Sequence, residues 1–136
     1  MEDNRKIKEI YNCKAIVSSE ELYPLQKWYN RLIDKKIDEI TVADILRMIR
    51  QKELMNLAMS KAINFLQENV FVGESYEGEL FEKISEMDSS FLISYADDLK
   101  EIIKSALVKS EIHDWSYEGE EEEFKDLIDS LSKKVK

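Results

Sequence analysis

The side chains that most often carry chemistry are scarce in this 136-residue chain, which has one cysteine, Cys13, and one histidine, His113. A zinc site needs about four Cys or His ligands, and a helical metalloprotease motif needs two histidines one turn apart. The pair could act only as a nucleophile and its base, and no neighbouring residue favours that role. Gly73, Gly78 and Gly119 are too dispersed for a phosphate-binding loop. We therefore expect no catalytic residue, metal or cofactor, and no enzyme.

Carboxylates are the one abundant reactive group, with 29 acids against 20 bases and a net charge of −9. Residues 71–136 contain 18 of these acids and only eight bases, so the rest of the chain is nearly neutral. The clusters are Glu74, Glu77, Glu79 and Glu82; Asp97, Asp98 and Glu101; and Glu118 with Glu120 to Glu123. Such charge disfavours nucleic acid and anionic membranes as direct partners and favours a basic protein.

Two other interpretations of the acidic clusters stay open. Carboxylates bind Mg²⁺, although the run from Glu120 to Glu123 lacks the glycine turn and the alternating ligands of an EF-hand loop. Acids also begin helices, where they favour the positive end of the dipole, and they aid solubility. Three clusters in one half of the chain favour a partner that needs the charge, because self-repulsion costs stability.

Four aromatic residues, Tyr76, Tyr95, Trp115 and Tyr117, lie beside the acidic clusters and outside the clear apolar stripes. Rings surrounded by charge are typical of hot spots in protein interfaces. The same residues could instead pack beneath loops, as could His113, and the sequence does not decide between the two.

The pentapeptide Ser-Tyr-Glu-Gly-Glu occurs twice, at residues 75–79 and 116–120. A repeat of about 40 residues is typical of some helical arrays. Both copies also precede a helical stripe, where a serine cap and dipole-facing glutamates would explain them. We favour two helix starts, because the similarity ends after five residues.

Apolar residues recur at helical spacing along most of the chain, and no segment alternates over a strand length. Residues 53–69 are apolar on most sides and predict the central helix. Leu25 and Leu107 are expected on buried faces, and the last helix is expected to fray from Lys133. The stripes cover residues 7–14, 25–33, 42–49, 53–69, 80–87, 99–107 and 124–131.

Local signals predict where two of these helices begin. Thr41 with Asp44 has the spacing of a capping box. Ser18 with Glu21 has the same spacing, and Pro24 fits a first helical turn.

The chain is therefore predicted to be all-α, a single compact bundle of six or seven helices with no sheet. Residues 1–136 are expected to form one domain, because no linker interrupts them. No uncharged run approaches the roughly 20 residues of a membrane span, and the N-terminus is charged from its second residue. A lone cysteine allows no internal disulfide. We expect a cytoplasmic protein.

Two stretches carry a family resemblance. The first covers Leu22–Leu32 and Asp34–Gln51 and includes the run Arg-Met-Ile-Arg-Gln at residues 47–51. The second covers Phe71–Leu80 and Ile84–Met87. Together they resemble the immunity proteins of contact-dependent growth inhibition (CDI) systems over about residues 22–110, whereas the tail from residue 111 matches no pattern.

The resemblance implies an inhibitor. Such a protein lies in the cytoplasm of a toxin-producing bacterium, where it binds the C-terminal toxin domain of its cognate effector and blocks it. Toxins of these systems are frequently nucleases, and one group that is partnered with helical immunity proteins is similar to RNase A. The charge argument agrees independently, because a nuclease site that attracts phosphate is basic.

We therefore predict a one-to-one complex between a monomer and a basic toxin domain, whose Lys and Arg side chains pair with the acids of the second half. Arg47 and Arg50 could instead be structural and tie down acids such as Asp34 or Asp44, and the sequence does not decide between this role and a place in the site. The alternative is a helical adaptor or regulator of another basic protein. The predicted partner-binding residues are Glu74, Tyr76, Glu77, Glu79, Tyr95, Asp97, Asp98, Trp115, Glu118 and Glu121.

Overall fold

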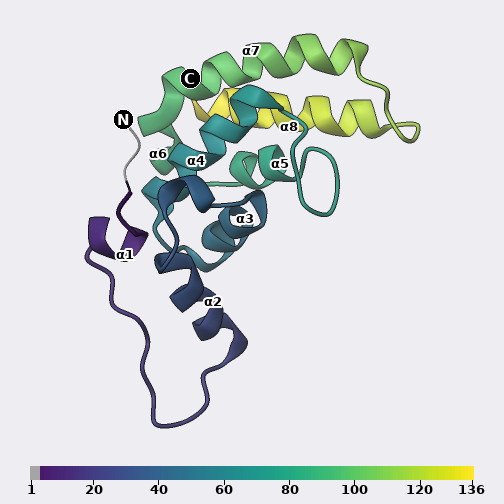
Figure 1. Cartoon of the computed structure of the whole chain (residues 1–136). Coiled ribbons are helices and arrows are strands. Elements are labelled where there is room, and N and C mark those ends of the chain that lie inside the picture. The colour runs from purple at the N-terminus through teal and green to yellow at the C-terminus, as the bar shows by residue number, and fades with distance from the viewer. Residues whose placement is uncertain (1–3) are drawn as a thin grey trace.

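A computed structural model describes residues 4–136 as a succession of helices (Figure 1). Within this range no strand forms, and a single isolated bridge joins Lys6 and Lys36. The all-α prediction is confirmed, with six helices of seven residues or more and two single-turn helices. The elements are α1 (Ile7–Ile10), α2 (Pro24–Ile33), η1 (Ile37–Glu39), α3 (Val42–Gln51), α4 (Met55–Glu68), α5 (Glu79–Ser85), α6 (Ser89–Leu92), η2 (Ile93–Tyr95), α7 (Ala96–Ile112) and α8 (Glu120–Lys134).

The capping box at the start of α3 is confirmed. Thr41 Oγ1 accepts a hydrogen bond from Asp44 N at 3.1 Å, and Asp44 Oδ2 accepts one from Thr41 N at 3.1 Å. Two of the backbone donors that a helix start leaves open are thereby satisfied.

The capping box predicted at residues 18–21 is wrong. The Ser18 hydroxyl bonds a backbone N–H within the preceding loop, and α2 begins only at Pro24. The fixed φ of proline suits the first helical position, and Gln26 Oε1 accepts a hydrogen bond from Tyr23 N at 2.9 Å. The proline, and not the serine, therefore sets this helix start.

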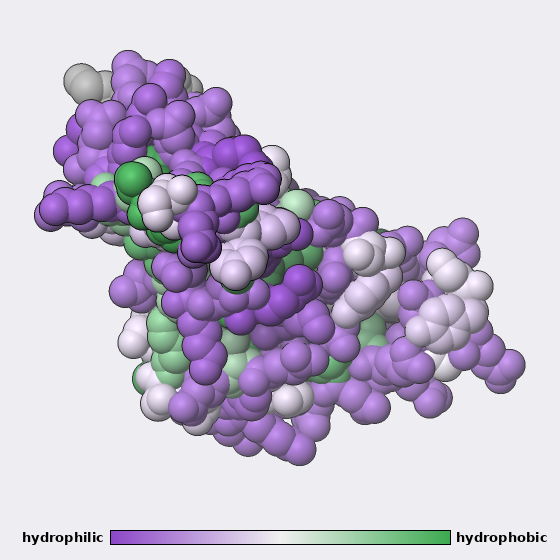
Figure 2. Space-filling view, turned by 90° about the horizontal axis from the view of Figure 1, so that it is seen from below, coloured by the Kyte–Doolittle hydropathy of each residue, from purple (hydrophilic) through white to green (hydrophobic). Residues whose placement is uncertain are grey.

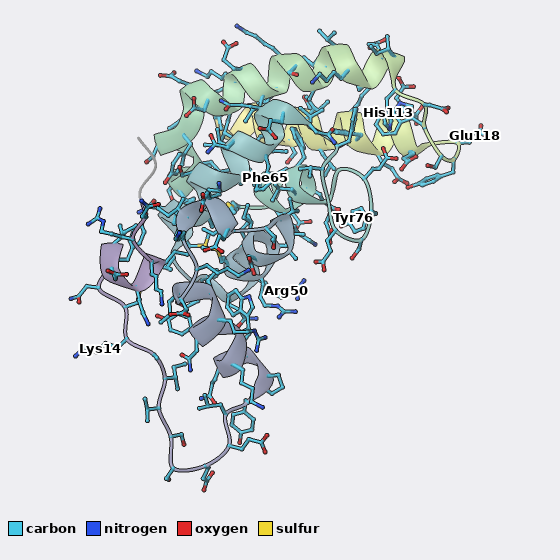
Figure 3. The ribbon with its side chains drawn as sticks, in the orientation of Figure 1. Lys14, Arg50, Phe65, Tyr76, His113 and Glu118 are labelled. Atoms are coloured by element: carbon cyan, nitrogen blue, oxygen red, sulfur yellow. The ribbon has the colours of Figure 1, made fainter. Side chains whose placement is uncertain are left out.

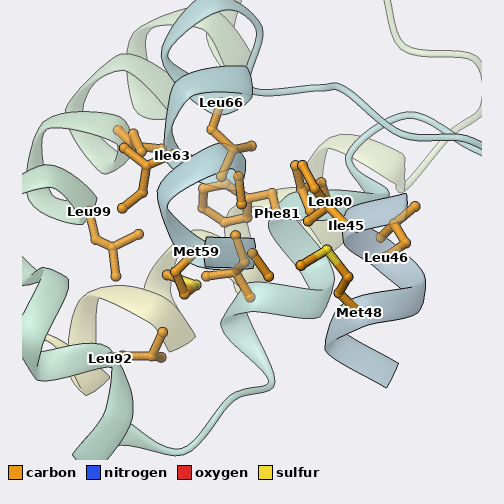
Figure 4. Close-up of a cluster of buried hydrophobic side chains, with 14 of the residues drawn as sticks. Ile45, Leu46, Met48, Met59, Ile63, Leu66, Leu80, Phe81, Leu92 and Leu99 are labelled. Atoms are coloured by element: carbon orange, nitrogen blue, oxygen red, sulfur yellow. The ribbon is translucent and has the colours of Figure 1, made fainter. Parts of the chain in front are cut away.

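The helix α4 lies at the centre of the fold, as predicted, and packs against α3, α5 and α7. Its buried residues surround most of its circumference, so that neighbours are needed on several sides. Figure 4 shows them interleaved with side chains of α3, α5 and α7. The fully buried members of this cluster include Ile45, Met48, Met59, Leu66, Leu80, Phe81 and Leu99.

The helices α7 and α8 lie antiparallel and are joined by residues 113–119 at one end of the molecule (Figure 1). The fraying predicted from Lys133 is wrong, because α8 runs to Lys134 and Val135 is buried. The Lys134 ammonium donates hydrogen bonds to the carbonyls of Ser85 at 2.7 Å and Met87 at 2.9 Å. These bonds tie the end of α8 to the end of α5.

Two predicted core residues are on the surface instead. Leu25 is 44% exposed in the first turn of α2, and Leu107 is 47% exposed at the edge of the apolar face of α7. No helix within residues 4–136 is long and apolar enough to cross a membrane.

Candidate partner-binding surface

The two copies of the repeated pentapeptide fold into the same turn. In each copy the last glutamate folds back and accepts a hydrogen bond from the backbone of the first serine. Glu79 Oε1 bonds Ser75 N at 2.9 Å, and Glu120 Oε1 bonds Ser116 N at 2.7 Å. Each carboxylate thus closes its own loop, which holds the preceding acidic residues in one conformation.

Both turns begin a helix, as predicted, but a glycine and not the serine is the N-cap. Gly78 has φ of 81° before α5, and Gly119 has φ of 94° before α8. These are left-handed conformations, which glycine adopts without the strain that a Cβ atom brings. Each serine contributes its backbone N–H to the hydrogen bond that closes its turn.

A tyrosine and a further glutamate extend the repeat beyond the predicted five residues. The Tyr76 hydroxyl donates a hydrogen bond to Glu82 Oε2, and the Tyr117 hydroxyl donates one to Glu123 Oε2 at 2.7 Å. Hydrogen bonding to these carboxylates is the main cause that raises the pKa of both phenols, because it favours the protonated tyrosine. The shared pattern is therefore Ser-Tyr-Glu-Gly-Glu-x-x-Glu, and the prediction that the similarity ends after five residues is wrong.

The two turns are held together by ring packing and one polar contact. His113 Nε2 lies 2.5 Å from Glu77 Oε2, and the His113 ring stacks on Phe71 with centroids 4.0 Å apart. Trp115 packs edge-on against Phe71 at 5.4 Å and against Phe124 at 5.6 Å. His113 and Trp115 thus pack beneath the loops, which was the alternative to a role as exposed interface residues.

A groove of about 490 Å³ separates the two turns. Residues 73–82 and 113–124, which we call the twin-turn surface, contain ten carboxylates and neither lysine nor arginine. Figure 3 shows Tyr76, His113 and Glu118 at this end of the molecule, and the face seen in Figure 2 is mostly hydrophilic there. The groove is lined by Tyr76, Glu77, Gly78, Glu82, Trp115, Tyr117, Glu120, Glu123, Phe124 and Leu127.

The structure divides the ten predicted partner-binding residues between the two ends of α7. Tyr95, Asp97 and Asp98 lie at its start, about 25 Å along the helix axis from its end, by the rise per residue. Tyr95 also donates a hydrogen bond to Asn56 Oδ1 at 2.6 Å, which ties η2 to α4. The other seven lie on the twin-turn surface: Glu74, Tyr76, Glu77, Glu79, Trp115, Glu118 and Glu121.

Glu79 does not fit the role predicted for it. It is only 7% exposed, and its Oε1 accepts hydrogen bonds from the backbone N–H groups of Glu74 and Ser75, both at 2.9 Å. Its carboxylate therefore shapes the first turn and is withdrawn from the surface. Glu121 is partly satisfied too, since Lys125 Nζ lies 3.5 Å from its carboxylate.

Sequence reasoning left Glu82, Tyr117 and Glu123 out of the site. All three line the groove. Tyr117 is the tyrosine of the repeat itself, and the signal for Glu82 and Glu123 is the glutamate at its eighth position, which both copies share. A comparison carried past the identical pentapeptide would have found it.

In the described structure Asp34 and Asp44 pair with lysines and not with Arg47 or Arg50, which answers the question that the sequence left open. Lys35 Nζ bonds Asp44 Oδ2 at 2.6 Å, and the N-cap lysine and one helical lysine of α1 pair with Asp34. Burial raises the pKa of Asp44, but the bonds from Lys35 and Thr41 outweigh it and hold that pKa below its usual value. The Arg47 guanidinium instead lies 5.8 Å from the centre of the Trp28 ring.

A second groove, of about 520 Å³, lies among α3, α4, α5 and α6. Its lining is largely apolar, with Arg50, Lys52 and Lys83 opposed by Glu86 and Asp88. Within residues 4–136 no group of three or more His, Cys, Asp or Glu side chains could hold a metal ion. The twin-turn surface is thus the region where charge of one sign is concentrated beside a groove.

A family model described as CDI immunity proteins matches residues 9–102. No curated protein sequence matches the chain. The matched residues include the first turn and α5, and they end within α7, before the second turn and α8.

Proposed function

The chain belongs to the family of CDI immunity proteins, and on that premise we propose that it binds and neutralises the C-terminal toxin domain of a cognate contact-dependent growth inhibition effector. It acts as an inhibitor in the cytoplasm, as a monomer in a one-to-one complex, without a cofactor. The family match supports neutralisation of a toxin, and the acidity of the twin-turn surface supports the proposal that the toxin binds there.

The observation that best supports binding through this surface is its concentration of negative charge. The twin-turn surface has ten carboxylates, all but Glu79 at least partly exposed, and no lysine or arginine, and its two turns are held in shape by their own hydrogen bonds. A nuclease must attract phosphate, so its active site presents cationic side chains to such a surface. We propose that the toxin is a nuclease, with the kind similar to RNase A that the sequence resemblance suggests as the first candidate, and that the acids imitate the charge of its substrate. Complementary charge also steers rapid association.

For an immunity protein we expect a gene for the cognate effector immediately upstream. Titration calorimetry against the toxin domain encoded there tests the proposal, at low and at moderate salt, with nuclease activity measured in parallel. We expect nanomolar one-to-one binding that abolishes nuclease activity. Binding should weaken as salt rises, because salt screens the attraction between the exposed carboxylates and the basic toxin. Absence of binding would contradict the proposal. A different basic protein recovered by pull-down would then favour the helical adaptor or regulator.

A further inference from the structure

Two equivalent tyrosine–glutamate pairs line the groove between the turns. Glu82 is fixed by the hydroxyl of Tyr76, and Glu123 by the hydroxyl of Tyr117. All four residues line the same groove. The carboxylates of both Glu123 and Glu82 raise the pKa of Tyr117, which agrees with their convergence on one space.

Within residues 4–136, these carboxylates lack the basic side-chain partners that other acids of the region have. Glu77 contacts His113, and Glu121 pairs with Lys125. In the part of the chain that the structure describes, no lysine or arginine forms an ion pair with Glu82 or Glu123. Two like charges that face one groove repel each other, and a cation placed between them would relieve that repulsion.

The walls of the groove favour a flat cation over a compact one. The rings of Tyr76, Trp115 and Tyr117 line it, and aromatic faces attract guanidinium groups. Arginine donates hydrogen bonds to two carboxylates at once and stacks on rings, whereas lysine is a strongly hydrated point charge. A groove of about 490 Å³ has room for neighbouring side chains as well, so a protein segment fits it better than a free ion does.

We propose that the groove receives an arginine of the toxin domain, whose guanidinium lies between Glu82 and Glu123 beside the rings of Tyr76 and Tyr117. This inference rests on the proposed function and names the contact that anchors the complex. The tyrosine hydroxyls hold the carboxylates in place before binding, so less side-chain entropy is lost when the arginine arrives.

The test compares variants with the same change in charge at the two ends of α7. Glu82→Gln with Glu123→Gln removes two charges from the groove and keeps an acceptor for each tyrosine. Asp97→Asn with Asp98→Asn removes two charges from exposed positions at the far end. A third variant, Tyr76→Phe with Tyr117→Phe, leaves the net charge unchanged and frees the two carboxylates. Thermal melts check that each variant is folded.

Rates of association with and dissociation from the upstream-encoded toxin domain are then measured at moderate salt. We expect the groove variant to weaken affinity by about tenfold or more, chiefly through faster dissociation, and the far-end variant to change it less than about twofold. We expect the phenylalanine variant to weaken affinity by about threefold to tenfold, because the freed carboxylates must then lose side-chain entropy when the arginine binds. If the groove and far-end variants bind alike, the groove contact is wrong and the proposed function stands.

If the wild-type protein does not bind the toxin domain, the proposed function fails. A peptide experiment then tests separately whether the groove binds arginine. A short arginine-rich peptide is titrated into the ¹⁵N-labelled protein, and the amide signals of Gly78 and Gly119 report on the two turns. Shifts that are large in the wild type and lost in the Glu82→Gln, Glu123→Gln variant support a site for arginine. Shifts that are absent, or equal in the two proteins, overturn it.

Discussion

The two turns contain the same closing glutamate in different surroundings, which allows its contribution to stability to be predicted. Glu79 is 7% exposed and accepts two backbone hydrogen bonds, whereas Glu120 is half-buried and accepts one at the corresponding position. The perturbation is Glu79→Ala, with Glu120→Ala as its matched counterpart and Glu79→Gln as the conservative control. Each alanine leaves N–H donors of its turn without their acceptor.

The expected magnitudes follow from these bonds. A hydrogen bond to a buried charged acceptor contributes about 1.5–3 kcal/mol, and a more exposed one contributes about 1 kcal/mol because water can replace the lost partner. We expect Glu79→Ala to lower the free energy of unfolding by about 3 kcal/mol and Glu120→Ala by about 1 kcal/mol. A neutral acceptor is roughly half as strong, so Glu79→Gln should cost about 1–1.5 kcal/mol.

Urea unfolding followed by circular dichroism measures all three differences, and thermal melts check them. At roughly 4 °C per kcal/mol for a chain of this size, Tm should fall by about 12 °C for Glu79→Ala and by about 4 °C for Glu120→Ala. The reasoning would be refuted if the two alanine variants were equally stable, or if Glu79→Gln were as unstable as Glu79→Ala. Either result would mean that the buried carboxylate does not hold the first turn.

Three further predictions concern packing, association and pH. A Cβ atom on Gly73 would lie 2.1 Å from the carbonyl oxygen of Tyr76, so Gly73→Ala should lower the free energy of unfolding by about 2 kcal/mol or more, measured in urea. Glu118→Lys with Glu122→Lys reverses two exposed charges and should slow association with the toxin domain by about tenfold and flatten its salt dependence; an unchanged salt slope in stopped-flow experiments would reduce this cluster to a solvated helix start. Because the pKa of Asp44 is lowered on folding, its ionised form stabilises the protein above the unfolded pKa of about 3.9, and this contribution is lost as pH falls through the lower folded value. The stability gap between wild type and Asp44→Asn should therefore be about 1–2 kcal/mol at neutral pH and close in acid, as urea titrations at several pH values would show.

The helices were predictable because their signals are local. Thr41 and Asp44 are three residues apart and satisfy each other in the first turn of α3. Pro24 marks the start of α2 for a similar reason, since its φ is fixed within one residue. The failed capping box at residues 18–21 shows the limit of such signals, because the same spacing also occurs in a loop.

The candidate surface was less predictable because it depends on distances across the fold. Asp97 and Glu118 belong to one acidic half of the sequence, but a 17-residue helix separates them. Glu79 belongs to an acidic cluster, and only its folded-back carboxylate reveals that it is buried. The groove requires α5 and α8 to pack together, with the rings of Phe81 and Phe124 5.1 Å apart, and no local pattern predicts that pairing.

The packing of α8 connects the family scaffold to the proposed binding surface. The family match covers the first turn and ends before the second, yet the groove needs both. Phe124, Ile128 and Leu131 bury α8 in the same core as α5, so the second turn is held against the first by apolar contacts rather than by the acids themselves. The carboxylates repel one another and would drive the turns apart, and the core must offset that cost. Affinity for a basic partner should therefore depend on buried residues such as Phe124 as well as on the exposed acids, because loss of the packing separates the two halves of the groove without removing a charge.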